Sequence, residues 1–169
     1  MKTLRTKDLV ISALGIALVF LATFILKIPN GIQGYVNMGD GFIMLFASLL
    51  HPSLAFLVGG AGSALADAAG GYGIYMIPTL LIKGSEAVLI SYFVSKQKSY
   101  RYVSYILGSI LMITGYFITD AFVNQSWILA ASGIIGNIIQ GGVGCIVASV
   151  AYPFIEKQVR PLLYPQKNS

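Results

Sequence analysis

Apolar runs separated by short polar breaks make up most of the chain. Their lengths approach the ~20 residues that an α-helix needs to cross a bilayer. The breaks contain Pro or Gly, as at His51-Pro52 and Gly70-Gly71, where helices commonly end. The pattern predicts one all-α integral membrane domain over residues 1–169. It is expected to be a bundle of six transmembrane helices near 8–28, 39–50, 53–69, 74–95, 102–122 and 127–155.

Composition agrees with a protein that lies in a membrane. Hydrophobic residues make up 56% of the 169, charged residues only 10%, and the mean hydropathy is +0.79. Soluble domains carry roughly a quarter charged residues. The first apolar run, residues 9–26, exceeds the about 7–15 residues of a signal-peptide core. We therefore expect a multi-pass protein of the cell membrane that retains its first helix.

The net charge of +5 comes from basic residues at the ends of apolar runs, which is typical of membrane anchors and not of a nucleic-acid-binding surface. With six spans, nine basic residues fall on one face: Lys2, Arg5, Lys7, Lys96, Lys98, Arg101, Lys157, Arg160 and Lys167. Among loop residues only Lys27 falls on the other face. The positive-inside rule then predicts cytoplasmic termini, N-in and C-in, with extracellular loops near 34–40, 70–73 and 123–126.

Small residues recur every four positions in two predicted helices. The stripes are Ala55, Gly59, Ser63 and Asp67, and Gly133, Asn137, Gly141, Cys145 and Ser149. This spacing lets helix backbones approach closely, so both stripes are predicted to be internal seams. A further small patch, Ala13 with Ala17, lies in the cytoplasmic half of the first helix. It could face lipid, another helix of the bundle or a partner protein.

The polar stretch 34–40, Gly-Tyr-Val-Asn-Met-Gly-Asp, separates two apolar runs. Its glycines allow tight turns, and its aromatic ring, amide and carboxylate exceed what a simple connector needs. We interpret it as a lid over a polar cavity at the extracellular face. Tyr35 is then placed to stack on a planar ligand.

Lys83 and Glu86 lie inside the fourth predicted helix, three residues apart on one face. Ionisable groups within a bilayer are costly unless they face a cavity or a partner, which makes them candidates for function. Two interpretations stay open: an ion pair that only stabilises the bundle, or contact with a ligand. Tyr75 and Thr79 extend the same face outward.

Further polar side chains lie on other predicted helices. Asn137 and Gln140 share a face of the sixth helix, where amides can bind ligand or join helices. Tyr116 and Asp120 share the outer end of the fifth helix, and Asp67 ends the third. The two aspartates could be interface residues or counter-charges to the buried lysine.

No enzyme motif occurs in the sequence, and in particular no P-loop that could bind ATP. A single cysteine, Cys145, and a single histidine, His51, argue against an internal disulfide and against a metal centre. We expect no catalytic activity and no cofactor. Two classes remain: the binding subunit of an ATP-driven importer, or a self-sufficient small carrier that is proton-coupled through Glu86.

With these features the chain resembles the substrate-binding S components of energy-coupling factor (ECF) vitamin transporters. The resemblance covers essentially the whole chain. It rests on Ala13-x-x-x-Ala17, the stretch 34–40, Gly-Ser-Ala-Leu-Ala-Asp67 with Gly71-Tyr72, and Lys83-Gly84. The Val-Asn-x-Gly-Asp and Leu-Ala-Asp motifs are similar to those of a subgroup usually assigned to hydroxymethylpyrimidine or pyridoxine, with riboflavin as a relative's substrate.

The resemblance implies an extracellular vitamin site between the loop after the first helix and helices four to six. It also implies that Ala13 and Ala17 dock on a transmembrane T component, and that two cytoplasmic ATPases complete the importer. Hydroxymethylpyrimidine or pyridoxine is the favoured substrate, with riboflavin, pantothenate or another vitamin as alternatives. The expected substrate contacts are Tyr35, Asn37, Asp40, Asp67, Tyr75, Lys83, Glu86, Tyr116, Asn137 and Gln140.

Overall fold

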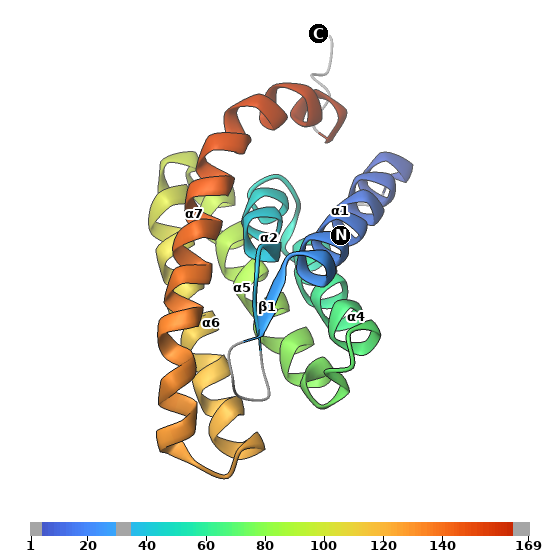
Figure 1. The fold of residues 1–169 in the computed structure, drawn as a ribbon. Helices are drawn as coiled ribbons and strands as arrows, with labels where there is room; N and C mark the ends of the chain where they lie inside the picture. Colours follow the sequence, from blue (N-terminus) through green and yellow to red (C-terminus); the bar gives the residue numbers. More distant parts are fainter. Residues whose placement is uncertain (1–4, 30–34, 164–169) are drawn as a thin grey trace, which may run out of the picture.

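A computed structural model of the chain describes residues 5–29 and 35–163 and has the form of a helical bundle with one small strand pair (Figure 1). Within these ranges, four helical segments are long and apolar enough to cross a membrane. They are α1 (Thr6–Ile25), α5 (Met76–Lys96) with the short helix η2 (Gly73–Tyr75) before it, α6 (Arg101–Val123) with η3 (Lys98–Tyr100) before it, and α7 (Trp127–Leu163). The all-α class and the multi-pass membrane character are confirmed.

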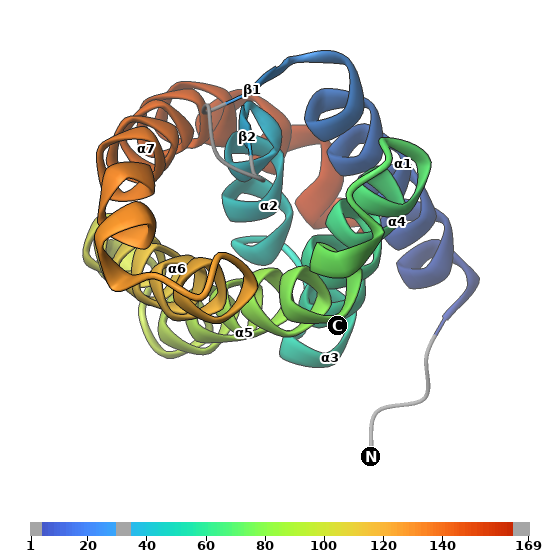
Figure 2. The ribbon, with the colours of Figure 1, turned by 60° about the horizontal axis from the view of Figure 1, so that its bottom comes forward.

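The short helix α2 (Gly39–Ala47) lies inside the bundle. All of its residues except Phe42 are buried, and Figure 2 shows it among α1, α5 and α7. It is about 14 Å long at the usual helical rise. It begins near the middle of α5, where Asp40 contacts Lys83, and ends near the start of α6, where Ser48 is 2.8 Å from the Tyr105 hydroxyl. It stops at Ala47 and not near residue 50, because the chain turns there toward the His51-Pro52 break.

Residues 52–69 follow one helical path of three parts: α3 (Pro52–Phe56), the π-helical turn η1 (Leu57–Ala61) and α4 (Gly62–Ala69). The π turn passes very close to α5. A Cβ at Gly59 would lie 2.7 Å from the backbone oxygen of Lys83, and one at Gly60 would lie 2.7 Å from that of Leu80. The stripe that contains Gly59 is therefore an internal seam, as predicted.

A strand pair after α1 was not predicted. β1 (Lys27–Pro29) and β2 (Tyr35–Asn37) are antiparallel, with Lys27 opposite Asn37. The first helix ends at Ile25 and not near residue 28, because the residue before Pro29 is restricted to extended backbone. Gly34, the first residue of the predicted lid, lies outside the described residues.

The last helix is longer than predicted. α7 continues to Leu163, beyond the expected end near residue 155. Pro153 and Pro161 lie within it, and proline commonly kinks a long helix without ending it. Figure 1 shows the C-terminal part of α7, in red, bending over the end of the bundle toward α1. Lys157 and Arg160, expected in a tail, are therefore helical, and Lys167 lies outside the described residues.

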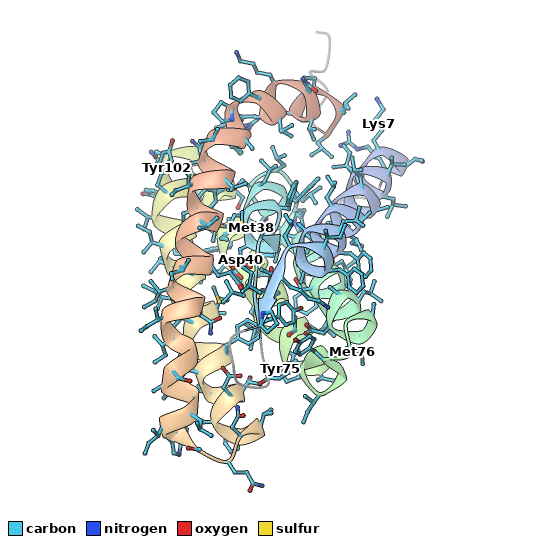
Figure 3. The ribbon with its side chains drawn as sticks, in the orientation of Figure 1. Lys7, Met38, Asp40, Tyr75, Met76 and Tyr102 are labelled. Carbon is cyan, nitrogen blue, oxygen red and sulfur yellow. The ribbon has the colours of Figure 1, made fainter. Side chains whose placement is uncertain are left out.

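Contacts between basic residues and their partners join several chain segments at one end of the bundle. Arg5 donates to the carbonyl of Leu163, which joins the start of α1 to the end of α7. Lys98 lies 2.7 Å from Glu156 of α7. In Figure 3, Lys7 and Tyr102 lie toward this end, while Tyr75 lies toward the other.

Candidate functional site

A polar cavity lies against β2, on the side of the bundle where η2 is found. It encloses about 380 Å³ of space not filled by atoms, counting its open mouth. Side chains from β2, α4, η2, α5, α6 and α7 form its walls. The described residues that line it are Tyr35, Asn37, Asp67, Tyr75, Thr79, Tyr116, Asp120, Asn137 and Gln140.

Seven of the ten expected contact residues therefore line one cavity, and the other three, Asp40, Lys83 and Glu86, lie behind its wall. The cavity also includes Thr79 and Asp120, which were not among the expected contacts. Each is four residues after a lining tyrosine, and this helical spacing is the pattern that places them on the same face.

Tyr35 joins the strand pair to α4. Its hydroxyl donates to Asp67 Oδ1 over 2.5 Å, a bond to a charged acceptor. Its ring contacts that of Tyr72, with centroids 4.6 Å apart. Burial, followed by the neighbouring Asp67 carboxylate, raises the pKa of Tyr35 above its usual range. The hydroxyl therefore stays protonated and acts as a donor.

A second tyrosine–aspartate pair forms another part of the wall. Tyr75 donates to Asp120 Oδ1 over 2.8 Å, and the hydroxyls of Thr79 and Tyr116 are 3.1 Å apart. The walls thus combine aromatic rings with fixed polar groups. Such a surface suits a small planar ligand with polar substituents.

A chain of hydrogen bonds connects β2, α7 and α2. The backbone N–H of Asn37 donates to Gln140 Oε1 over 2.8 Å, and Gln140 Nε2 donates to Asp40 Oδ2 over 3.0 Å. The Asn37 side chain accepts from the backbone N–H of Gly39 over 2.8 Å. The strand pair is therefore held on the helices by buried polar groups.

Lys83 lies behind the cavity in a buried charge cluster. Its ammonium donates to Asp40 Oδ1 and is 3.4 Å from Glu86 Oε2. All three side chains are at most 1% exposed. One of the two interpretations was an ion pair between Lys83 and Glu86, and this pair is present. Asp40 is an additional partner of Lys83. Two carboxylates thus share one ammonium.

The cavity itself is acidic. Asp67 and Asp120 line it, and no Lys, Arg or His does so among the described residues. The nearby Lys83 ammonium is engaged in its own cluster and lies 5.5 Å from the ring centroid of Tyr116. A ligand with N–H or O–H donors fits these walls, whereas a ligand carboxylate would meet like charge. No group of metal-ligating side chains occurs in residues 5–29 and 35–163.

Ala13 and Ala17 face away from the bundle. Both are exposed, whereas Gly15 between them is buried. A Cβ at Gly15 would lie 3.0 Å from the side chains of Phe46 and Val58, so this glycine forms the inward contact. Of the three interpretations of the small patch, contact with another helix of the same bundle holds for Gly15 and not for Ala13 and Ala17.

Comparisons with known proteins identify the family. Residues 3–157 match the family model described as ECF-type riboflavin transporter, S component. A protein of Pyrococcus woesei described as uncharacterized is 34% identical over 148 residues, which are 86% of this chain and 99% of that protein. The thiamine precursor transporter HmpT of Lactococcus lactis subsp. cremoris (strain MG1363) is 29% identical over 153 residues, 89% of each chain.

The fold has a counterpart among solved structures. The crystal structure at 2.1 Å of the S component for biotin from an ECF-type ABC transporter matches with a TM-score of 0.60 and 22% identity. The match covers 94% of this chain and 95% of that one, and it concerns the fold alone. The family model includes every described residue of the cavity wall. This chain therefore belongs to the S components of ECF-type transporters, which are membrane subunits that bind substrate and are not enzymes.

Proposed function

We propose that this chain binds hydroxymethylpyrimidine or pyridoxine in the acidic cavity and delivers it to an ATP-driven importer. The observation that carries the proposal is the cavity itself, an aromatic and acidic pocket in an S component, roofed by a strand pair. Similarity to a thiamine precursor transporter supports the pyrimidine, because hydroxymethylpyrimidine is such a precursor. Both molecules contain a single ring and several hydrogen-bond donors.

Direct contacts are assigned to the residues of the cavity wall. The Asn137 side chain makes no hydrogen bond with any described residue, which leaves its donor and acceptor for a ligand. Tyr35 covers the ligand from the strand pair. Asp40, Lys83 and Glu86 are proposed to act from behind, by holding Gln140 and the wall in place.

Riboflavin is the second candidate, because the matching family model is described by that vitamin. Its three fused rings and sugar-alcohol chain demand much more room than a single ring. The cavity proper is small, about 30 Å³, so any vitamin must widen it. A single ring requires less widening than three fused rings.

Orientation and assembly complete the proposal. Six membrane-crossing segments result when the path from β2 through α2 and the path from α3 to α4 are counted with the four long ones. The basic end then faces the cytoplasm and the cavity faces outside, with N-in and C-in topology in the cell membrane. The exposed pair Ala13 and Ala17 docks on a T component, and two ATPase subunits hydrolyse ATP.

The ligand retained by the protein tests the proposal. The tagged chain is purified in detergent from cells grown with vitamins, the bound molecules are released by denaturation, and mass spectrometry identifies them. We expect hydroxymethylpyrimidine or pyridoxine, together with co-purified T component and ATPases. Retention of riboflavin alone would favour the second candidate, and a chain that transports without any partner would contradict the importer assignment.

A further inference from the structure

Only one of the two Asp67 carboxyl oxygens has a hydrogen-bond partner among the described residues. Its Oδ1 accepts the hydrogen bond from Tyr35 over 2.5 Å. Its Oδ2 is buried and has no hydrogen-bond partner within residues 5–29 and 35–163. The residue is 2% exposed and lines the cavity. A buried carboxyl oxygen without a hydrogen-bond partner is costly, so this position calls for a partner from elsewhere.

Three donor groups lie near Asp67. The Thr79 hydroxyl lies beside it and is 3.1 Å from the Tyr116 hydroxyl, a pair in which either group can donate. The Lys83 ammonium is held by Asp40 and Glu86. The Lys27 ammonium lies over aromatic rings, 4.7 Å from the centroid of Phe24 and 5.4 Å from that of Tyr72. None of the three makes a hydrogen bond with Asp67 Oδ2 within the described ranges, so a molecule in the cavity can supply the donor.

We infer that Asp67 Oδ2 accepts a hydrogen bond from an exocyclic amine on the ligand ring, and that this bond selects aminopyrimidines. The inference rests on the proposed function and narrows its substrate class. An aromatic amine donates N–H in the ring plane, so a ring lying beside Tyr35 can direct it at a carboxylate on the adjacent wall. Hydroxymethylpyrimidine carries such an amine, and the selection acts against analogues that carry only an acceptor at this ring position, since a hydroxyl group, as in pyridoxine, can also donate.

The same carboxylate rejects related molecules. If an oxo group replaces the amine, two acceptor oxygens face each other with no proton between them. If the ring carries a carboxylate there, two negative charges meet in an acidic cavity. A site built to pair with a donor discriminates strongly against analogues that lack it, because its buried group is then left unpaired.

The test compares hydroxymethylpyrimidine with its oxo analogue, in which oxygen replaces the amine. Calorimetry on the detergent-purified chain should show that the wild type prefers the amine by about tenfold or more. Asp67→Asn offers an amide that can donate to the oxo group. This variant should bind the amine about tenfold to a hundredfold more weakly and should narrow or invert the preference.

Asp120→Asn is the matched control, since it removes the same charge from the same cavity. Asp120 already accepts from Tyr75, and neither of its oxygens is a buried atom without a partner among the described residues. This variant should weaken both probes alike and keep their ratio. Thermal unfolding in detergent reports whether each variant is folded.

A folded Asp67→Asn variant that keeps the wild-type ratio would overturn the inference. If that variant does not fold, the wild type decides, because equal affinity for the two probes overturns the inference while leaving the proposed function intact. Binding of riboflavin alone, or of no vitamin, would overturn both.

Discussion

Gln140 fastens the strand pair to α7, because its side-chain oxygen accepts a hydrogen bond from the backbone N–H of Asn37 over 2.8 Å. The nitrogen of the same amide donates to Asp40 Oδ2 over 3.0 Å. One side chain, 3% exposed, thus positions both the roof of the cavity and a carboxylate of the charge cluster behind it. The shape of the cavity depends on this amide whether or not it touches the ligand.

Replacing Gln140 by Met should weaken the attachment of the strand pair β1–β2 to α7. The substitution keeps the length of the side chain but removes its hydrogen bonds, each worth about 0.5–1.5 kcal/mol. We expect ligand affinity to fall by about tenfold and the Asn37 amide to exchange its hydrogen faster. Calorimetry and hydrogen–deuterium exchange measure these effects. Gln97→Met, on an exposed turn, is the control, and equal behaviour of the two variants would refute the role of Gln140.

The charge cluster should respond very differently to two substitutions. Lys83→Met leaves Asp40 and Glu86 buried without their ammonium, and loss of one partner from a buried pair costs about 3–5 kcal/mol. Glu86→Gln keeps the shape and leaves one carboxylate for one ammonium, so its stability should change by less than about 1 kcal/mol. Thermal unfolding in detergent compares them. If Glu86→Gln is as destabilising as Lys83→Met, two carboxylates do not share one ammonium as described.

Removing all three charges of the cluster separates support from ligand contact. If Lys83 and Glu86 act only from behind the wall, replacing both by Met together with Asp40→Asn should give a folded protein, because no buried charge is then left without a partner. The amide oxygen introduced at position 40 can still accept from Gln140, so affinity should change little. A folded triple variant that has lost binding entirely would instead place Lys83 and Glu86 in contact with the ligand.

Much of the fold could be predicted because membrane helices demand uninterrupted apolar runs. The observed α1, α5 and α6 begin and end within a few residues of the predicted positions, as this requirement explains. The strand pair has only three residues in each strand, too few for an alternating pattern. The predicted end of the last helix near residue 155 was wrong because the helix continues past it to Leu163 and keeps Pro161 inside, where packing decides between a kink and a stop.

Helical spacing allowed those residues of the cavity wall to be predicted that lie on the same face of one helix. Tyr116 with Asp120, and Asn137 with Gln140, share faces because they are three or four residues apart. The partner of Lys83 was not predictable in this way. Asp40 lies 43 residues earlier, and only the packing of α2 against α5 brings the two together. Long-range pairs of this kind leave no periodic trace in the chain.

The exposed small patch of α1 should be required for assembly. Replacing Ala13 and Ala17 together by Leu or Trp blocks close approach of another helix. Transport and co-purification of the T component should be lost, while ligand binding by the isolated subunit is kept. Gly142→Leu, at an exposed position of α7 with open space for a side chain, is the control. A double variant that assembles and transports normally would contradict the docking assignment.

The orientation can be tested by cysteine labelling in a Cys145→Ser background. Gly73 suits the outer site, because it is exposed and a Cβ there meets nothing within 4 Å. Gly71, with its φ of +84°, would be strained by a side chain, and Gly31 lies outside the described residues. Cysteine at position 73 should react with an impermeant reagent on intact cells, and Lys98→Cys should not. The reverse pattern would contradict N-in topology.

Titration calorimetry of the purified wild-type chain with hydroxymethylpyrimidine, pyridoxine, riboflavin and pantothenate tests the central claim most directly. The acidic, aromatic cavity predicts tight one-to-one binding of hydroxymethylpyrimidine or pyridoxine and no binding of the anionic pantothenate. Tight binding of pantothenate, or of riboflavin with no response to either single-ring molecule, would contradict the account.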